Sequence, residues 1–109
     1  MSRKKEFTKT LDKFGFERLR VRLTIDKGTI TDLVFQYESN IKDEWKPIVR
    51  YDIAHGFFHR DFLFPNGEKE KVRIEIQDLK LAAMFAEQDI KDKWEFYKNR
   101  YLKERKGKK

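Results

Sequence analysis

Alternation between apolar and polar side chains dominates the first two thirds of the chain and is strictest between residues 17 and 26. A period of two is that of a β-strand with one buried and one solvated face. The apolar positions are Leu19, Val21, Leu23 and Ile25, and the polar positions are Arg18, Arg20, Arg22 and Thr24. The pattern leaves two roles open for this first predicted strand. Its three arginines can face phosphate groups, or its edge can pair with a second subunit.

Turn residues divide the rest of this region into four more strands. Asp26-Lys27-Gly28 is a tight hairpin signal, because glycine readily adopts the positive φ that such turns need. Pro65-Asn66-Gly67 is a second turn signal. Pro47 has no N–H to donate to a neighbouring strand, which places the start of its strand at a sheet edge or a bulge. The strands are expected at about 29–38, 45–52 and 57–64, with a short one that includes Val72, Ile74 and Ile76.

The period changes from two to 3.6 after residue 77. Asp78 is a suitable N-cap, and apolar side chains then recur at steps of three and four to about residue 104, as on an amphipathic helix. These positions are Leu79, Ala83, Ala86, Ile90, Trp94, Tyr97 and Tyr101. At the other end of the chain, Phe7, Leu11 and Phe14 show similar steps, so we expect a short helix or an irregular lead-in over 3–14.

Strands first and a helix last are typical of the α+β class. We therefore expect an antiparallel β-meander of about five strands, with the long C-terminal amphipathic helix packed on one face. A chain of 109 residues is too short for two ordinary cores. The predicted organisation is a basic lead-in or short helix over 1–14, a single α+β domain over 15–102 and a basic tail over 103–109.

Composition excludes some kinds of binding site and argues against a membrane protein. The absence of cysteine excludes disulfides and zinc–cysteine sites, which leaves metal binding to His, Asp and Glu, and we expect no metal or other cofactor. The sequence has no run of about 18 apolar residues and no apolar leader, so we expect a cytoplasmic protein without a membrane partner. Abundant Lys and Glu together with no Cys match the composition of many thermophile proteins.

The net charge of +7 is concentrated at the two ends of the chain. Residues 1–13 carry five basic and two acidic side chains, and residues 98–109 carry seven basic side chains and one acidic one. The C-terminal basic residues are candidates for contacts with RNA phosphates, although a tail of this kind also serves as a solvated, solubilising end. The candidates are Lys103, Arg105, Lys106, Lys108 and Lys109.

Titratable side chains are densest between Arg50 and Asp61, where the sequence is Arg-Tyr-Asp-Ile-Ala-His-Gly-Phe-Phe-His-Arg-Asp. This stretch spans the end of one predicted strand, a turn and the start of the next strand. With a connection of two or four residues, Arg50 pairs with His59 across the hairpin. The register then places Arg50, Asp52, His59 and Asp61 on one face, and Tyr51 and Phe58 on the other.

These residue types suit metal-independent cleavage of RNA. The reaction needs a base for the 2′-hydroxyl proton, an acid for the leaving oxygen and a cation for the developing charge on the phosphate. The candidates are His55 and His59 for acid and base, Arg50 for the cation, and Asp52 or Asp61 for fixing a histidine tautomer, with Arg60 as a further phosphate contact.

Two other roles are open for the same stretch. A His-x3-His pair shares a face on a helix, but on a strand the two side chains lie roughly 13 Å apart, so a zinc site requires the turn to fold His55 back. Alternatively, Arg50, Asp52, His59 and Asp61 form a surface cluster that holds the hairpin together, each pair contributing about 0.2–1 kcal/mol.

The stretch from Arg50 to Asp61, followed by Pro65-Asn-Gly-Glu-Lys-Glu70, resembles the signature of a small uncharacterised prokaryotic family. This family is a domain of unknown function with an Arg-Tyr-Asp-x-Ala-His-Gly-x-x-His-Arg-Asp core, and the resemblance covers 27–101. More distantly, the stretch is similar to TumE-type toxins of toxin–antitoxin pairs. The toxin resemblance implies RNA cleavage or inhibition of translation, and a cognate antitoxin as partner. The site residues that it implies are Arg50, Asp52, His55 and His59.

Two functions from different classes are therefore predicted. The first is that of a small RNA-acting protein, either a toxin-like metal-independent endoribonuclease or a translation inhibitor. The second is that of a non-catalytic module that binds RNA, a ribosome or a protein, in which the hairpin is structural. RNA cleavage that depends on the two histidines supports the first function. RNA binding that weakens with salt and with removal of 103–109 supports the second.

Overall fold

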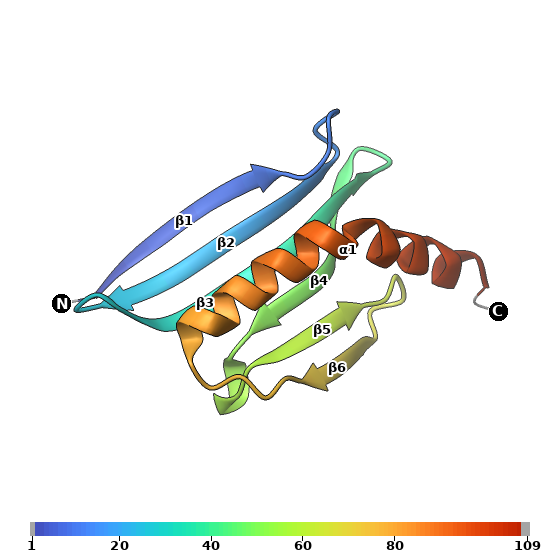
Figure 1. Ribbon diagram of the computed structural model, residues 1–109. Coiled ribbons are helices and arrows are strands. Elements are labelled where there is room, and N and C mark those ends of the chain that lie inside the picture. The colour runs from blue at the N-terminus through green and yellow to red at the C-terminus, as the bar shows by residue number, and fades with distance from the viewer. Residues whose placement is uncertain (1, 108–109) are drawn as a thin grey trace.

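The computed structural model describes residues 2–107, with side chains described as far as Lys103. The chain forms a six-stranded antiparallel sheet followed by a long helix, so the predicted α+β class is confirmed. Each strand pairs with the next along the chain, and the helix lies across one face of the sheet (Figure 1). The elements are β1 (Ser2–Thr10), β2 (Glu17–Asp26), β3 (Thr29–Ile41), β4 (Glu44–Asp52), the 3₁₀ helix η1 (Ala54–Gly56), β5 (His59–Leu63), β6 (Lys69–Arg73) and α1 (Leu79–Gly107).

The N-terminal segment is a strand, so the prediction of a short helix or an irregular lead-in over 3–14 is wrong for β1. This strand pairs with β2 along its whole length and raises the number of strands from about five to six. Phe7 is the one β1 side chain that packs against the core, whereas Phe14, in the loop that follows, is 78% exposed. With a single core contact, β1 has no period-two pattern of its own, and its conformation is set by hydrogen bonding to the edge of β2.

The arginine-rich strand β2 has the bounds that its alternation predicts, but it is not an edge strand. Both of its edges are occupied, one by β1 and the other by β3. Pairing of this strand with a second subunit, one of the two roles left open by the sequence, is therefore wrong. The edges of the sheet are β1 and β6, and both are rich in lysine and arginine, which discourages pairing with other chains.

Pairs of residues with positive φ close two of the hairpins. Lys27 and Gly28, with φ of 53° and 80°, connect β2 to β3 as the sequence predicts. Lys42 and Asp43, with φ of 55° and 68°, make the same kind of connection between β3 and β4 without a glycine. Only residues 42 and 43 separate the two strands, so β3 extends to Ile41 and is longer than the predicted 29–38.

Pro47 lies beside an irregularity in the pairing of β3 with β4. Tyr37 pairs with Val49, whereas the next residue of β3, Glu38, pairs with Pro47. The pairing thus skips Ile48 and forms a β-bulge. A bulge or an edge is expected here because Pro47 has no N–H to donate.

The C-terminal helix α1 begins at the predicted cap. Asp78 Oδ1 accepts hydrogen bonds from the N–H groups of Lys80 (2.8 Å) and Leu81 (3.2 Å). The apolar stripe of α1 packs mainly on β3 and β4. The buried core consists of Leu19, Val21, Leu33, Phe35, Tyr37, Ile48, Val49, Tyr51, Phe58 and Phe62 before the helix, and Ala82, Ala83, Ala86, Ile90, Tyr97 and Tyr101 within it. Within the described part of the chain, no helix is both long and apolar enough to cross a membrane.

Buried carboxylates accept hydrogen bonds from tyrosine hydroxyls, and the bond from Tyr51 of β4 to Asp89 of α1 attaches the helix to the sheet. The Tyr51 hydroxyl of β4 and the Tyr97 hydroxyl of α1 both donate to Asp89 Oδ2, at 2.6 and 2.5 Å. The Tyr37 hydroxyl donates to Glu17 Oε1 at 2.6 Å. Because each carboxylate is almost fully buried, these hydrogen bonds replace water that folding removes.

The helix covers one face of the sheet and leaves the other face without a covering element (Figure 1). Val21, Phe35 and Tyr51 are neighbours across β2, β3 and β4 on the face toward α1. The residues that alternate with them, Arg20, Gln36 and Arg50, are neighbours on the opposite face, which we call the open face. The open face therefore carries the polar half of the strand pattern.

Candidate functional site

The stretch from Arg50 to Asp61 forms the end of β4, the turn η1 and the start of β5. Arg50 pairs with Asp61, and Asp52 pairs with His59. The predicted pairing of Arg50 with His59 is therefore wrong by two residues, because the connection is longer than assumed. A shift of two keeps each side chain on its predicted face, so these four side chains share the open face as expected.

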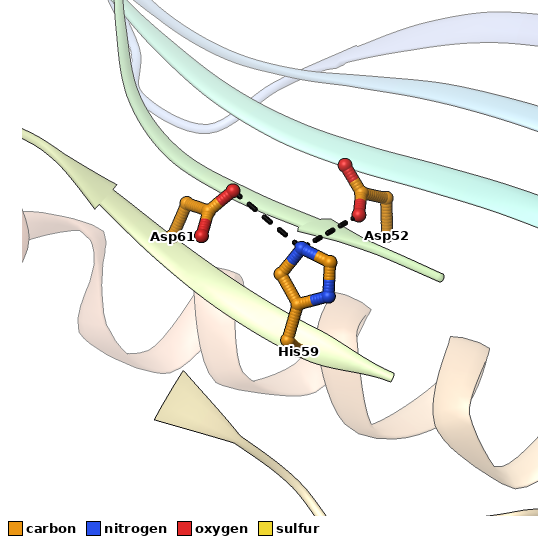
Figure 2. Close-up of side chains that lie close together, drawn as sticks. All are labelled: Asp52, His59 and Asp61. Carbon is orange, nitrogen blue, oxygen red and sulfur yellow. Dashed lines mark ion pairs between the residues drawn. The ribbon is translucent and has the colours of Figure 1, made fainter. Parts of the chain in front are cut away.

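His59 lies at the centre of a buried cluster, which we call the hairpin cluster and define as Asp52, His59, Asp61 and Lys71. His59 Nε2 is 2.8 Å from Asp52 Oδ1 and 3.5 Å from Asp61 Oδ2, and the two carboxylates converge on it from β4 and β5 (Figure 2). Lys71 Nζ of β6 is 3.1 Å from Asp61 Oδ1. The His59 and Asp61 side chains are only 1% and 3% exposed. The hairpin thus carries a polar cluster, but His59 and Asp61 are buried where a surface cluster is predicted, and Lys71 takes the place of Arg50.

Both ring nitrogens of His59 face hydrogen-bond acceptors. Nδ1 is 3.2 Å from the Phe57 carbonyl oxygen, and Nε2 faces the two carboxylates. A neutral imidazole carries a single N–H, so only the imidazolium donates to both sides at once. With the ring buried and Nε2 already engaged, this arrangement favours a structural role for His59 over proton exchange with a bound RNA.

His55 folds back toward His59, which the cleavage and zinc hypotheses both require. Its backbone has φ of 72°, and the centroids of the two imidazole rings are 6.2 Å apart. The Phe57 ring lies 5.3 Å from the His59 ring, so the turn covers the buried histidine. His55 itself is exposed. Within the described residues, the potential metal ligands that converge are Asp52, His59 and Asp61, so His55 is not one of them.

Three arginines line a concavity of about 570 Å³ on the open face. Arg20 and Arg22 come from β2 and Arg50 from β4, and the acidic side chains of Glu6 and Asp52 also line it. Neither Arg22 nor Arg50 forms an ion pair with a carboxylate among the residues that the structure describes. Two guanidinium groups at this concavity are therefore without a direct carboxylate contact among the described residues, although Glu6 and Asp52 share the lining with them.

A network of side chains beside the concavity orients Arg50. Its Nε donates to Gln36 Oε1 at 2.7 Å, and the Gln36 amide donates in turn to Glu38. Glu38, which is 4% exposed, also pairs with Arg18 at 2.7 Å and Arg20 at 3.3 Å. Since Arg50 uses only Nε in this network, its two Nη groups are left for a ligand.

A family model described as Domain of unknown function (DUF7718) matches residues 1–107, which is almost the whole chain. The chain belongs to this family. Membership of an uncharacterised domain family, expected from the sequence, is thereby confirmed, and the match extends beyond the 27–101 expected. The resemblance to TumE-type toxins stays a prediction. No curated protein and no solved structure matches this DUF7718 chain.

Arg60 and Lys103, two further candidate residues of this DUF7718 chain, are not among the residues that line the concavity. Arg60 is on the face toward α1, where its Nη1 is 3.5 Å from the hydroxyls of Tyr51 and Tyr97, so the sheet separates it from Arg50. Lys103 is exposed near the end of α1. The other tail candidates lie outside the described residues, namely the side chains of Arg105 and Lys106 and the whole of Lys108 and Lys109.

The sequence offers Arg20 and Arg22 only as part of an arginine strand that can face phosphate, and it gives no indication of Lys71. The alternation of apolar and polar residues over 17–26 is the pattern that places these two arginines on a solvent-facing side of their strand. Nothing local in the sequence places Arg50 beside them, because that neighbourhood depends on β3 lying between β2 and β4. Lys71 has no local signal either, since it reaches Asp61 through the pairing of β5 with β6.

Proposed function

We propose that this DUF7718 protein is a non-catalytic RNA-binding module that holds the RNA backbone on its open face. The observation that carries the proposal is the pair Arg22 and Arg50, two guanidinium groups without a carboxylate partner among the described residues, at one concavity. Guanidinium groups bind phosphate through two parallel N–H bonds, and a pre-oriented arginine loses less conformational freedom on binding. The contact of Arg50 with Gln36 supplies that orientation.

The open face is better suited to binding the sugar–phosphate backbone of RNA than to reading its bases. Single-strand binders that read bases usually offer exposed aromatic rings for stacking. The Trp45 ring of β4 is instead covered by the Arg18 guanidinium, whose carbon lies 3.7 Å from the ring centroid. We therefore expect little sequence preference and a steep dependence on salt. A cytoplasmic location is part of this proposal, and a ribosome as the source of the RNA stays a prediction.

The test is RNA binding by the full chain and by Arg22→Gln/Arg50→Gln, measured by fluorescence anisotropy with a single-stranded RNA across a series of salt concentrations. Loss of two phosphate contacts is expected to weaken binding on the order of 100-fold. The slope of log K against log salt should become shallower by roughly 1.4, because each contact with a single strand releases about 0.7 counterion.

Lys80→Ala/Lys91→Ala is the matched control, because it removes the same charge from exposed positions on α1. It should bind RNA within about twofold of the parent at moderate salt. A third variant that ends at Leu102 measures the contribution of the basic tail over 103–109. Equal loss in the two double variants would reduce the effect to net charge and contradict the proposal. So would binding that is insensitive to salt.

The proximity of His55 to His59 favours RNA cleavage as a second candidate function. An exposed imidazole whose ring centroid lies 6.2 Å from that of a second imidazole can act as a base. On this proposal the chain cleaves RNA in the presence of EDTA, and His55→Gln lowers the rate at least 100-fold. Cleavage that continues at the parent rate in His55→Gln/His59→Gln would exclude it. A cognate antitoxin is a partner only if the toxin resemblance holds.

A further inference from the structure

The hairpin cluster brings together three side chains of the kind that bind transition metals. One ligand atom each from Asp52, His59 and Asp61 lies within 4.8 Å of the other two. The three residues come from paired positions of β4 and β5, where the backbone is held by the sheet. Ligands on rigid strands keep their geometry better than ligands on loops.

The distances are close to those of a metal site. With metal–ligand bonds of about 2.0–2.2 Å, the ligand atoms of a tetrahedral ion lie roughly 3.3–3.6 Å apart. His59 Nε2 is 3.5 Å from Asp61 Oδ2 and 2.8 Å from Asp52 Oδ1. A displacement of less than about 1 Å therefore suffices to admit an ion between the three groups.

Contacts behind His59 and Asp61 hold two of the three groups in place. The Phe57 carbonyl lies 3.2 Å from His59 Nδ1, which fixes the neutral ring with its proton on Nδ1 and its lone pair on Nε2. Lys71 contacts Oδ1 of Asp61 and leaves Oδ2 directed at the histidine. These two contacts lie on the far side of the ligand atom, as is usual at a metal site. The Ala54 N–H donates at 3.2 Å to Asp52 Oδ1, the same oxygen that faces His59 Nε2.

We propose that Asp52, His59 and Asp61 bind one divalent transition-metal ion. One imidazole nitrogen and two carboxylate oxygens suit Zn²⁺ and Mn²⁺, whereas an imidazole in the set disfavours Mg²⁺. The ion replaces the direct contacts of His59 Nε2 with the two carboxylates. The inference does not depend on the proposed RNA binding. Metal binding and acid catalysis by His59 exclude each other, because both use Nε2.

Isothermal titration calorimetry of the full, metal-free chain with ZnCl₂, MnCl₂ and MgCl₂ at neutral pH tests the proposal. One site is expected, with affinity falling from Zn²⁺ to Mn²⁺ to Mg²⁺. His59→Gln and Asp61→Asn should each weaken Zn²⁺ binding at least 100-fold. The matched control, His55→Gln, should bind as the parent does.

Lys71→Met is a variant that should bind Zn²⁺ more tightly than the parent chain, a result that misfolding cannot produce. The lysine ammonium is a cation on Asp61 that opposes a second cation nearby, so its removal should strengthen Zn²⁺ binding by about tenfold. Zn²⁺ affinity in the millimolar range for the parent chain would overturn the proposal. Affinity that survives His59→Gln, or that is lost in His55→Gln, would overturn this ligand set.

Discussion

Replacing Asp89 with alanine should lower the free energy of unfolding by about 3 kcal/mol. The Asp89 carboxylate is 8% exposed and accepts the hydroxyl hydrogens of Tyr51 and Tyr97. Without it, both hydroxyls are buried beside Arg60, which can only donate. Each unsatisfied hydroxyl costs about 1–2 kcal/mol, which together is a large share of the roughly 5–15 kcal/mol expected of a domain of this size.

Urea unfolding followed by circular dichroism measures this cost. Asp89→Asn retains one oxygen acceptor and should lose less stability than Asp89→Ala. Asp92→Ala is the matched control on the same helix, because Asp92 is exposed and accepts a hydrogen bond from Gln88, an exposed neighbour one turn away. It should change the unfolding free energy by no more than about 0.5 kcal/mol. A cost below about 1 kcal/mol for Asp89→Ala would show that the tyrosine hydroxyls find other partners.

Stability should also fall steeply as the pH rises from about 10 to 12. Burial, followed by the hydrogen bond to Asp89, raises the pKa of Tyr97 to about 12. Burial and hydrogen bonds to carboxylates also raise the pKa values of Tyr37 and Tyr51. In the unfolded chain tyrosine ionises near pH 10, so above that pH the unfolded state holds fewer protons than the folded state. The stability contributed by these groups is therefore complete below about pH 10 and lost above it.

For Tyr97 alone the loss is on the order of 3 kcal/mol once the pH passes about 12. Tyrosinate absorbance at alkaline pH, recorded together with the far-ultraviolet circular dichroism, checks this expectation. The absorbance of the buried tyrosines should rise together with the loss of helix. Tyr97→Phe should reduce the pH dependence by about one proton, while Tyr101→Phe is the control. Ionisation near pH 10 without unfolding would contradict the expected protection of these hydroxyls.

The elements that could be predicted from the sequence are those whose own pattern of apolar and polar residues matches what surrounds them. β2 has the bounds of its alternation because its apolar side chains face α1 and its arginines face the open side. α1 begins at its predicted cap because Asp78 binds the N–H groups of the first turn, a contact within four residues. β1 was predicted as a short helix or an irregular lead-in because pairing with β2, and not burial, determines its conformation.

For the candidate site, too, one feature could be predicted from the sequence and another could not. The sequence indicated that Arg50, Asp52, His59 and Asp61 share a face, since a strand alternates with a period of two whatever its register. It did not indicate which of them pair, because the register follows from the conformation of the turn around His55. The place of Arg60 beside Tyr51 follows from that same register.

By itself the sequence determined the α+β class, the wet arginine face of β2, the cap and apolar stripe of α1 and the common face of the hairpin residues. Each of these depends on local conformation or on period alone. The tertiary structure alone decided that β1 covers the edge of β2, that Arg50 joins Arg20 and Arg22 at one concavity, and that Lys71 completes the hairpin cluster. These neighbourhoods join residues far apart in the chain, and strand pairing creates them only when the whole sheet has formed.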